Sequence, residues 1–163
     1  GRIGARSAGR GRGAIFTMRL RRIPEPARRA ASAATPSGVQ APRRILIIED
    51  NGDAREMLRA QLERAGHEVH AAADGPAGVE AAAPARPDVV LIDVGLPGFD
   101  GFEVARRIRA AAWGQSMRLV PLTGYGQADD RRQALAAGCD LHVTKPVMPE
   151  RLAEILAGAS EPR

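Results

Sequence analysis

A chain of 163 residues, 44% of them hydrophobic, can form one hydrophobic core but is too short for two, so we expect one globular domain. The formal charge of +5 is distributed unevenly along the chain. Residues 1–44 carry eleven arginines and one acid (+10), whereas residues 45–163 carry 13 basic and 18 acidic residues (−5). Nucleic-acid binding would therefore depend on the N-terminal arm alone. Cys139 is the only cysteine, which excludes an intrachain disulfide, and we expect it to be buried as a small apolar residue. No apolar run is long enough for a membrane span, and no signal peptide begins the sequence, so we expect a cytoplasmic protein.

The central and C-terminal parts of the chain alternate between two hydrophobic patterns. Residues 21–43, rich in Arg, Ala, Pro and Ser, are expected to form a linker. After them, short β-branched runs alternate with segments whose apolar residues recur at helical spacing. Five such units predict an α/β fold with a doubly wound, parallel, five-stranded sheet. The expected strands are 45–48, 68–72, 89–92, 119–122 and 141–144, and the expected helices are 53–65, 75–83, 102–112, 128–137 and 149–157.

Several residues are expected to set the ends of these helices. The first helix should begin at a capping box that starts at Asp53, carry Met57 on its apolar face, and stop at Gly66. Pro84 should lie beyond the end of the second helix. Asp100 is expected to cap the third helix.

Three of the expected strands end on charged residues. The first is followed by Glu49 and Asp50, the third by Asp93, and the fifth by Lys145, the only lysine in the chain. In doubly wound sheets, ligands bind outside the carboxyl ends of the strands. If these strands are adjacent, three carboxylates and one ammonium group share a cleft, which suits a divalent metal ion and a phosphoryl group.

Four motifs in this order resemble the receiver domain of two-component response regulators. Thr123 lies 30 residues after Asp93, and Lys145 lies 52 residues after it, as in that family. The resemblance covers essentially all of residues 44–157, so we expect a receiver domain at residues 44–159. It implies a flavodoxin-like receiver fold with strand order 2-1-3-4-5. The motifs are Ile47-Ile48-Glu49-Asp50-Asn51, Leu91-Ile92-Asp93-Val94-Gly95-Leu96-Pro97-Gly98-Phe99-Asp100-Gly101, Leu122-Thr123-Gly124 and Thr144-Lys145-Pro146.

The resemblance implies a role for each charged residue. Asp93 is expected to be the phosphoacceptor, taking a phosphoryl group from a phosphohistidine or a small phosphodonor. Mg²⁺ would be bound by Asp50, Asp93 and the backbone carbonyl of Gly95, and by Glu49 through water. Lys145 would pair with one phosphoryl oxygen. The hydroxyl of Thr123 would hydrogen-bond another.

The same resemblance implies a switch and a control of phosphate lifetime. Thr123 is expected to act with the residue three positions before the lysine, which is His142 here instead of the commoner Tyr or Phe. Gly95 and Tyr125 flank the expected path of a hydrolytic water. Pro146 is expected to follow a cis peptide bond.

The N-terminal arm resembles a second family. Residues 1–20 are similar to the last β-hairpin of a histidine kinase ATP-binding domain, which implies that the chain is the tail of a hybrid histidine kinase. Such a hairpin cannot bury its apolar face without the rest of its sheet, so we expect it to be loosely docked or poorly ordered and to bind no ATP. The alternatives are a disordered Arg/Gly-rich segment that contacts RNA or acidic surfaces, and an inert tail.

These observations predict a phosphoacceptor receiver that works in a two-component phosphorelay. Its expected partners are a histidine kinase or a histidine phosphotransfer protein, with a possible receiver homodimer through the face formed by helices 128–137 and 149–157. No DNA-binding domain is expected after Arg163, and no membrane contact by this chain. Two alternatives stay open: a receiver-like interaction module that does not use phosphorylation, and a flavodoxin-like cofactor binder, which the Glu-Asp-Asn loop disfavours.

Overall fold

A computed structural model describes residues 2–7, 9, 11–19, 41–124 and 128–158 of the chain. They fall into two units, one within Gly1–Val39 and one within Gln40–Arg163. Most of the linker predicted at 21–43 and the candidate lifetime residue Tyr125 lie outside the described residues. None of the helices in the described residues has the length and apolar character needed to cross a membrane.

The smaller unit is a β-hairpin. β1 (Arg2–Ser7) pairs antiparallel with β2 (Ala14–Arg19). Ile3 lies directly opposite Met18. Phe16 is two residues before Met18 on β2, so its side chain lies on the same face. These three side chains are 63–76% exposed, so the two paired strands by themselves leave the apolar face of the hairpin uncovered.

The larger unit is a parallel five-stranded sheet with the strand order β4-β3-β5-β6-β7. Counted from β3, this is the order 2-1-3-4-5 that the resemblance implied. The order reverses between β3 and β5, which places the carboxyl ends of these two central strands side by side. The strands are β3 (Arg44–Ile48), β4 (Glu68–Ala72), β5 (Val89–Asp93), β6 (Arg118–Thr123) and β7 (Val143–Thr144), and the helices are α1 (Gly52–Arg64), α2 (Gly75–Ala85), α3 (Gly101–Ala110), α4 (Ala128–Ala136) and α5 (Pro149–Ala157), with a short 3₁₀ turn at Ala112–Gly114.

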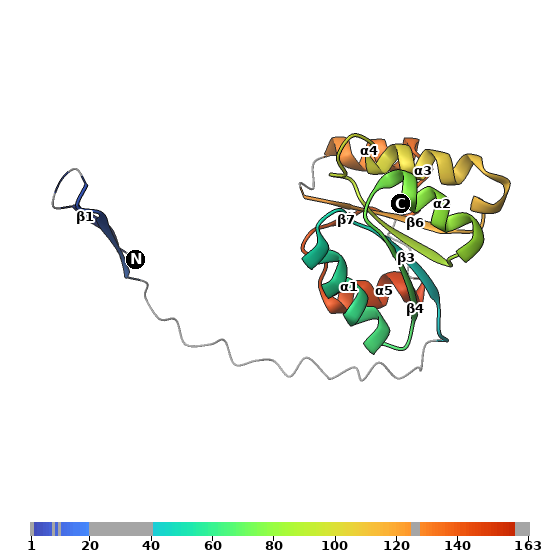
Figure 1. Ribbon diagram of the computed structural model, residues 1–163, viewed down its shortest axis with the longest axis horizontal. Helices are drawn as coiled ribbons and strands as arrows, with labels where there is room; N and C mark the ends of the chain where they lie inside the picture. Colours follow the sequence, from blue (N-terminus) through green and yellow to red (C-terminus); the bar gives the residue numbers. More distant parts are fainter. Residues whose placement is uncertain (1, 8, 10, 20–40, 125–127, 159–163) are drawn as a thin grey trace. The chain divides into compact units, whose positions relative to one another are not determined.

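Helices cover both faces of the sheet: α1 and α5 lie on one face and α2, α3 and α4 on the other (Figure 1). Alternate residues of each strand supply the two layers of the core. In β3, Ile45 and Ile47 pack toward α1 and α5, and Leu46 and Ile48 pack toward the other helices. Both faces are therefore apolar, as the continuous β-branched runs predicted.

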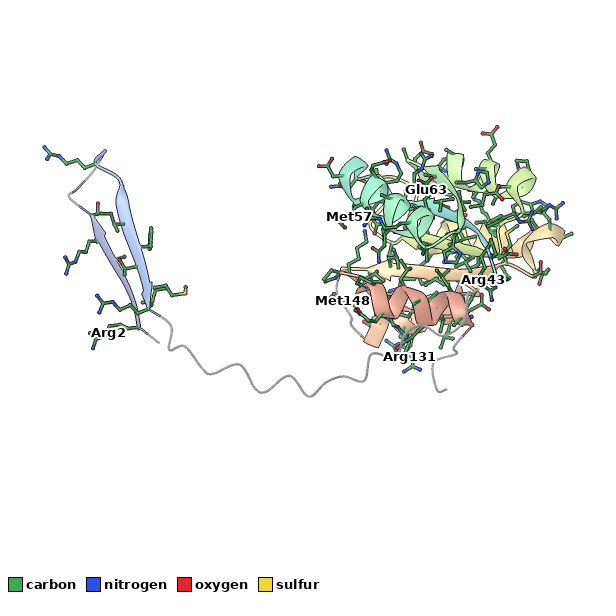
Figure 2. The ribbon with its side chains drawn as sticks, turned by 90° about the horizontal axis from the view of Figure 1, so that it is seen from below. Arg2, Arg43, Met57, Glu63, Arg131 and Met148 are labelled. Atoms are coloured by element: carbon green, nitrogen blue, oxygen red, sulfur yellow. The ribbon has the colours of Figure 1, made fainter. Side chains whose placement is uncertain are left out.

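The start of α1 differs from the prediction. The N-cap is Asn51, whose side-chain oxygen accepts a hydrogen bond from the backbone N–H of Ala54 at 3.0 Å, and Asp53 lies inside the first turn. The capping box predicted at Asp53 was wrong because Asn51 makes the capping bond first. Met57 was expected on the apolar face but is 66% exposed, at the edge of the unit where Met148 also lies (Figure 2).

Three other elements have a bound that lies two residues from the predicted one. α2 continues through Pro84 to Ala85 and closes on Arg86, which has a left-handed conformation (φ 46°). α3 stops at Ala110 because the 3₁₀ turn follows. This turn brings Gly114 back against the last turn of α3, where a Cβ would lie 1.8 Å from the carbonyl oxygen of Ile108, so only glycine fits there. β7 has only two residues, although residues 141–144 were predicted to form the strand.

The turn before β7 explains its shortness. The carboxylate of Asp140 accepts hydrogen bonds from the backbone N–H of Leu119 and from Arg109. These bonds fix Asp140 beside the start of β6, and the strand pairing of β6 with β7 begins only at Leu122 and Val143. Leu141 is buried without joining the strand. Cys139 is also buried, as predicted, and burial raises the pKa of its thiol to about 12.

Candidate functional site

The carboxyl ends of β3 and β5 bring together the acidic residues that the sequence singled out. One carboxylate oxygen from each of Glu49, Asp50 and Asp93 lies within 4.8 Å of the others. Glu49 and Asp93 are only 2% and 8% exposed, whereas Asp50 is exposed at the mouth of the site. Since three acidic groups this close repel one another, the cluster is suited to a cation.

Lys145, which follows β7, supplies a positive charge to this cluster. Its Nζ lies 2.6 Å from Oε2 of Glu49 and 3.0 Å from Oδ1 of Asp93. Burial lowers the pKa of Lys145, but hydrogen bonds and charge from Glu49 and Asp93 outweigh burial, so its pKa is raised above the ordinary lysine value. Lys145 therefore stays protonated and joins the two buried carboxylates. The Lys145–Pro146 peptide bond is cis, as the resemblance implied.

The loop after β5 fixes the carboxylate of Asp93. The backbone N–H of Gly95 donates a hydrogen bond to Oδ1 of Asp93 at 3.0 Å. Asp100 caps α3 through the N–H of Glu103, as predicted. A Cβ on Gly101 would approach the carbonyl oxygen of Asp93 to 2.3 Å, so α3 can start this close to β5 only with glycine at that position.

Thr123, at the end of β6, lines the site together with Asp93 and Lys145. Its hydroxyl is 2.9 Å from Nε2 of His142, and the side chain of Thr123 is 3% exposed. The backbone N–H of Lys145 donates to the carbonyl oxygen of Thr123 at 2.7 Å, which ties the two residues together. A pocket of about 430 Å³ opens between them, lined by Asp93, Val94, Gly95, Thr123, Gly124, Asp130 and Lys145.

The structure adds two residues that the sequence interpretation missed. Arg55 on α1 donates from Nη1 to the carbonyl oxygens of Glu49 and Asp50. Asp130 in the first turn of α4 lines the pocket with Asp93. Each is one of several charged residues on its helix, and only the fold shows that it lies at the site.

The comparison with known families matches residues 45–157 to the response regulator receiver domain. The chain belongs to this receiver family. The match decides against the flavodoxin-like cofactor binder that the sequence left open. Receivers exchange phosphoryl groups with histidine kinases or phosphotransfer proteins, so the family makes this chain a homologue of phosphoacceptor domains in two-component signalling.

Curated relatives place the receiver in two kinds of protein. The transcriptional regulator RpaA of Synechocystis is 36% identical over 115 residues, which are 70% of this chain and 48% of RpaA. The virulence sensor protein BvgS of Bordetella pertussis is 37% identical over 142 residues, covering 82% of this chain and 12% of BvgS. The chain thus spans about half the length of many relatives that it matches, and much less of BvgS.

Solved receivers have the same fold. The chemotaxis protein CheY4 of Vibrio cholerae superimposes with a TM-score of 0.69 at 30% identity, over 72% of this chain and 98% of CheY4. The receiver of the sensor histidine kinase PA1611 of Pseudomonas aeruginosa gives 0.67 at 34% identity, over 72% of this chain and 97% of that chain. The PA1611 receiver holds a magnesium ion in its active-site cleft.

Proposed function

We propose that this receiver takes a phosphoryl group on Asp93 and reports its arrival through Lys145, Thr123 and His142. The observation that carries the proposal is the bridge from Lys145 to Glu49 and Asp93 at the carboxyl ends of the strands. Together with Asp50, which lies in the same acidic cluster, this bridge supports Asp93 as the nucleophile, with two further acids and one protonated lysine beside it. An isolated acid in a solvated loop would need none of these partners.

The reaction requires little of the protein beyond positioning. An oxygen of Asp93 attacks the phosphorus of a phosphohistidine, a new O–P bond forms, and the P–N bond breaks as the imidazole leaves with the electron pair. Asp93 is held for this attack at Oδ1, which accepts from the N–H of Gly95 and contacts Nζ of Lys145. The open pocket beside it gives the donor access.

The acidic cluster fits Mg²⁺, which prefers a few carboxylates together with water. Asp50, Asp93 and the carbonyl of Gly95 would hold the ion directly, and Glu49, which Lys145 already binds, would hold it through water. When bound, the ion offsets the negative charge of the carboxylates and of the phosphoryl oxygens. The magnesium in the PA1611 receiver supports this assignment.

The phosphoryl group changes the partners of two residues. Lys145 can exchange Asp93 for a phosphoryl oxygen. The hydroxyl of Thr123 has one proton, so once it donates to the phosphoryl group it cannot also donate to Nε2 of His142. His142 must then donate the hydrogen bond itself or turn away, which transmits the event toward the face of α4 and α5.

The direct test uses Mg²⁺, acetyl phosphate and intact mass spectrometry. We expect one added phosphoryl group, which is lost in Asp93→Ala and after chelation of Mg²⁺. Asp129→Ala is the control, because Asp129 is exposed and paired with Arg132 on α4. Modification that persists in Asp93→Ala would refute the assignment, and no modification of the unsubstituted chain would favour the phosphorylation-independent module.

We propose that Gly95 keeps the phosphate lifetime short by leaving a path for water. A Cβ at this position would lie 3.6 Å from both carboxylate oxygens of Asp93, so a larger side chain would cover the phosphoryl group. Gly95→Asn should lengthen the half-life of the phosphorylated state, measured by mass spectrometry after removal of the donor. Tyr125 is proposed to flank the same path, and Tyr125→Ala tests it.

We infer that the chain comes from a hybrid histidine kinase, with residues 1–20 as the end of its ATP-binding domain, 21–43 as a linker and 44–159 as the receiver. The match to BvgS covers 82% of the 163 residues, about 134, whereas the receiver match covers 113 residues (45–157), so the similarity to a sensor protein extends past the receiver. The uncovered apolar face of the β1–β2 hairpin supports the same origin. The coding sequence upstream of Gly1 tests it: a kinase domain in the same frame is expected. Salt-sensitive RNA binding by residues 1–43, without such a domain, would favour the Arg/Gly-rich arm.

The proposed partner is a histidine kinase or a histidine phosphotransfer protein, and a receiver homodimer is proposed to form through α4 and α5. Leu135, 66% exposed on α4, offers an apolar contact for the homodimer. Light scattering before and after phosphorylation tests this contact. A phosphorylation-dependent mass increase that Leu135→Asp abolishes would support it, and an unchanged monomer would refute it.

A further inference from the structure

Arg55 lies beside the acidic cluster but outside the set of residues that react. It follows the N-cap of α1 by four positions, and its backbone N–H donates to the carbonyl of Asn51 at 2.9 Å. Its half-buried side chain folds back over the loop between β3 and α1. There Nη1 donates to the carbonyl oxygen of Glu49 at 2.6 Å and to that of Asp50 at 3.3 Å.

These two carbonyls belong to the residues whose carboxylates line the site. The N–H of Glu49 still bonds to the carbonyl of Ala72 on the neighbouring strand at 3.2 Å, so the loop leaves the sheet immediately after Glu49. The direction of the two peptide groups decides where the side chains of Glu49 and Asp50 point. Arg55 holds both peptide groups by hydrogen bonds to their carbonyl oxygens, from a guanidinium that stays charged at every physiological pH.

We propose that Arg55 is a positioning residue for the metal site, holding the Glu49–Asp50 backbone so that the exposed carboxylate of Asp50 faces the cleft. This inference rests on the proposed Mg²⁺ site. Groups that orient metal ligands commonly contribute about 10- to 100-fold to metal affinity. Because Arg55 acts through backbone carbonyls and not on the carboxylates themselves, we expect the lower end of this range.

The test is calorimetric titration of the full 163-residue chain with Mg²⁺ alone, without a phosphodonor. Arg55→Met keeps the aliphatic packing and removes the donors, and should weaken Mg²⁺ binding about tenfold. Arg59→Met is the matched control, since Arg59 lies one turn later on α1 and pairs with the exposed Glu63. Thermal unfolding without Mg²⁺ checks that each variant is folded.

Three outcomes would overturn the inference. Equal Mg²⁺ affinities of Arg55→Met and Arg59→Met would refute the role of Arg55 alone. A wild-type affinity in Arg55→Lys would show that charge suffices without the two-carbonyl geometry, whereas an intermediate affinity supports the proposal. Absence of Mg²⁺ binding by the unsubstituted chain would refute the proposed metal site and this inference together.

Discussion

Lys145 is a residue whose type matters as much as its charge. Its compact ammonium fits between Oε2 of Glu49 and Oδ1 of Asp93, where a planar guanidinium has no equivalent geometry. We predict that Lys145→Arg still accepts phosphate from acetyl phosphate but loses phosphorylation-dependent partner binding. Intact mass and pull-down with the partner, before and after phosphorylation, measure the two properties separately. Normal phosphorylation-dependent binding in this variant would count against the role given to Lys145.

His67 makes the stability of the larger unit depend on pH. Burial, and then the positive charge of Arg43, lower the pKa of His67, whose Nδ1 accepts a hydrogen bond from the backbone N–H of Arg43. The unfolded chain therefore binds a proton more readily than the folded one. Stability should decline as the pH falls below the unfolded value of 6.5 and level off below the lowered folded pKa.

A substitution isolates this effect. In His67→Asn the amide oxygen can still accept from Arg43 but does not titrate. Urea unfolding at pH 7.5 and 5.5 should therefore show a smaller acid loss in His67→Asn than in the wild type. His70→Asn is the control, because His70 is half-exposed beside Glu68. An acid loss in His67→Asn equal to that of the wild type would contradict the prediction.

At the scale of elements, Arg109 joins parts of the chain that no strand or helix connects. From α3 it donates to the carbonyls of Gly114, Gln115 and Met117 before β6, and to Gly138 and Asp140 before β7. Its side chain is only 20% exposed. Removing it would leave several carbonyl groups without their donor.

We predict that Arg109→Ala lowers the free energy of unfolding by about 3 kcal/mol, since several hydrogen bonds to one charge are lost together. Arg106→Ala, on the exposed side of the same helix and paired with Glu103, should change it by less than about 0.5 kcal/mol. Urea denaturation of both variants measures the difference. Similar losses in the two variants would show that Arg109 is not a tie between elements.

The sequence predicted the strands of the sheet better than the ends of the helices. β4 and α5 have the predicted bounds because clear stop signals flank them: Gly66 and the helix cap Asp74 enclose β4, and α5 lies between Pro149 and Gly158. The ends of the helices were harder to predict, since local features that involve only a few hydrogen bonds decide them: the cap Asn51, Pro84 inside α2, and the 3₁₀ turn after α3.

For the site, the charged residues that directly follow the strands were enough to predict the acidic cluster and Lys145. Arg55 and Asp130 were missed because their role depends on which way a helix faces.

At the scale of the whole molecule, the core belongs to the larger unit alone. Both clusters of buried hydrophobic residues in the described part of the chain draw their members from residues 45–156, and the side chains of β1 and β2 are exposed. We predict that residues 40–163 without the N-terminal segment retain phosphorylation on Asp93 and the same thermal unfolding midpoint. Calorimetry and intact mass test this, and a lower midpoint would show that the segment contributes to stability.

The bridge from Lys145 to Glu49 joins residues 96 positions apart. During synthesis the three acids are complete once Asp93 has been added, yet the ammonium that joins them follows 52 residues later, after all five strands of the sheet have been made. A chain that stops short, or whose last strand fails to dock, keeps the acids but lacks the lysine proposed to pair with the phosphoryl group. The assembled site thus exists only in a finished domain, and competence to signal is a property of the completed fold.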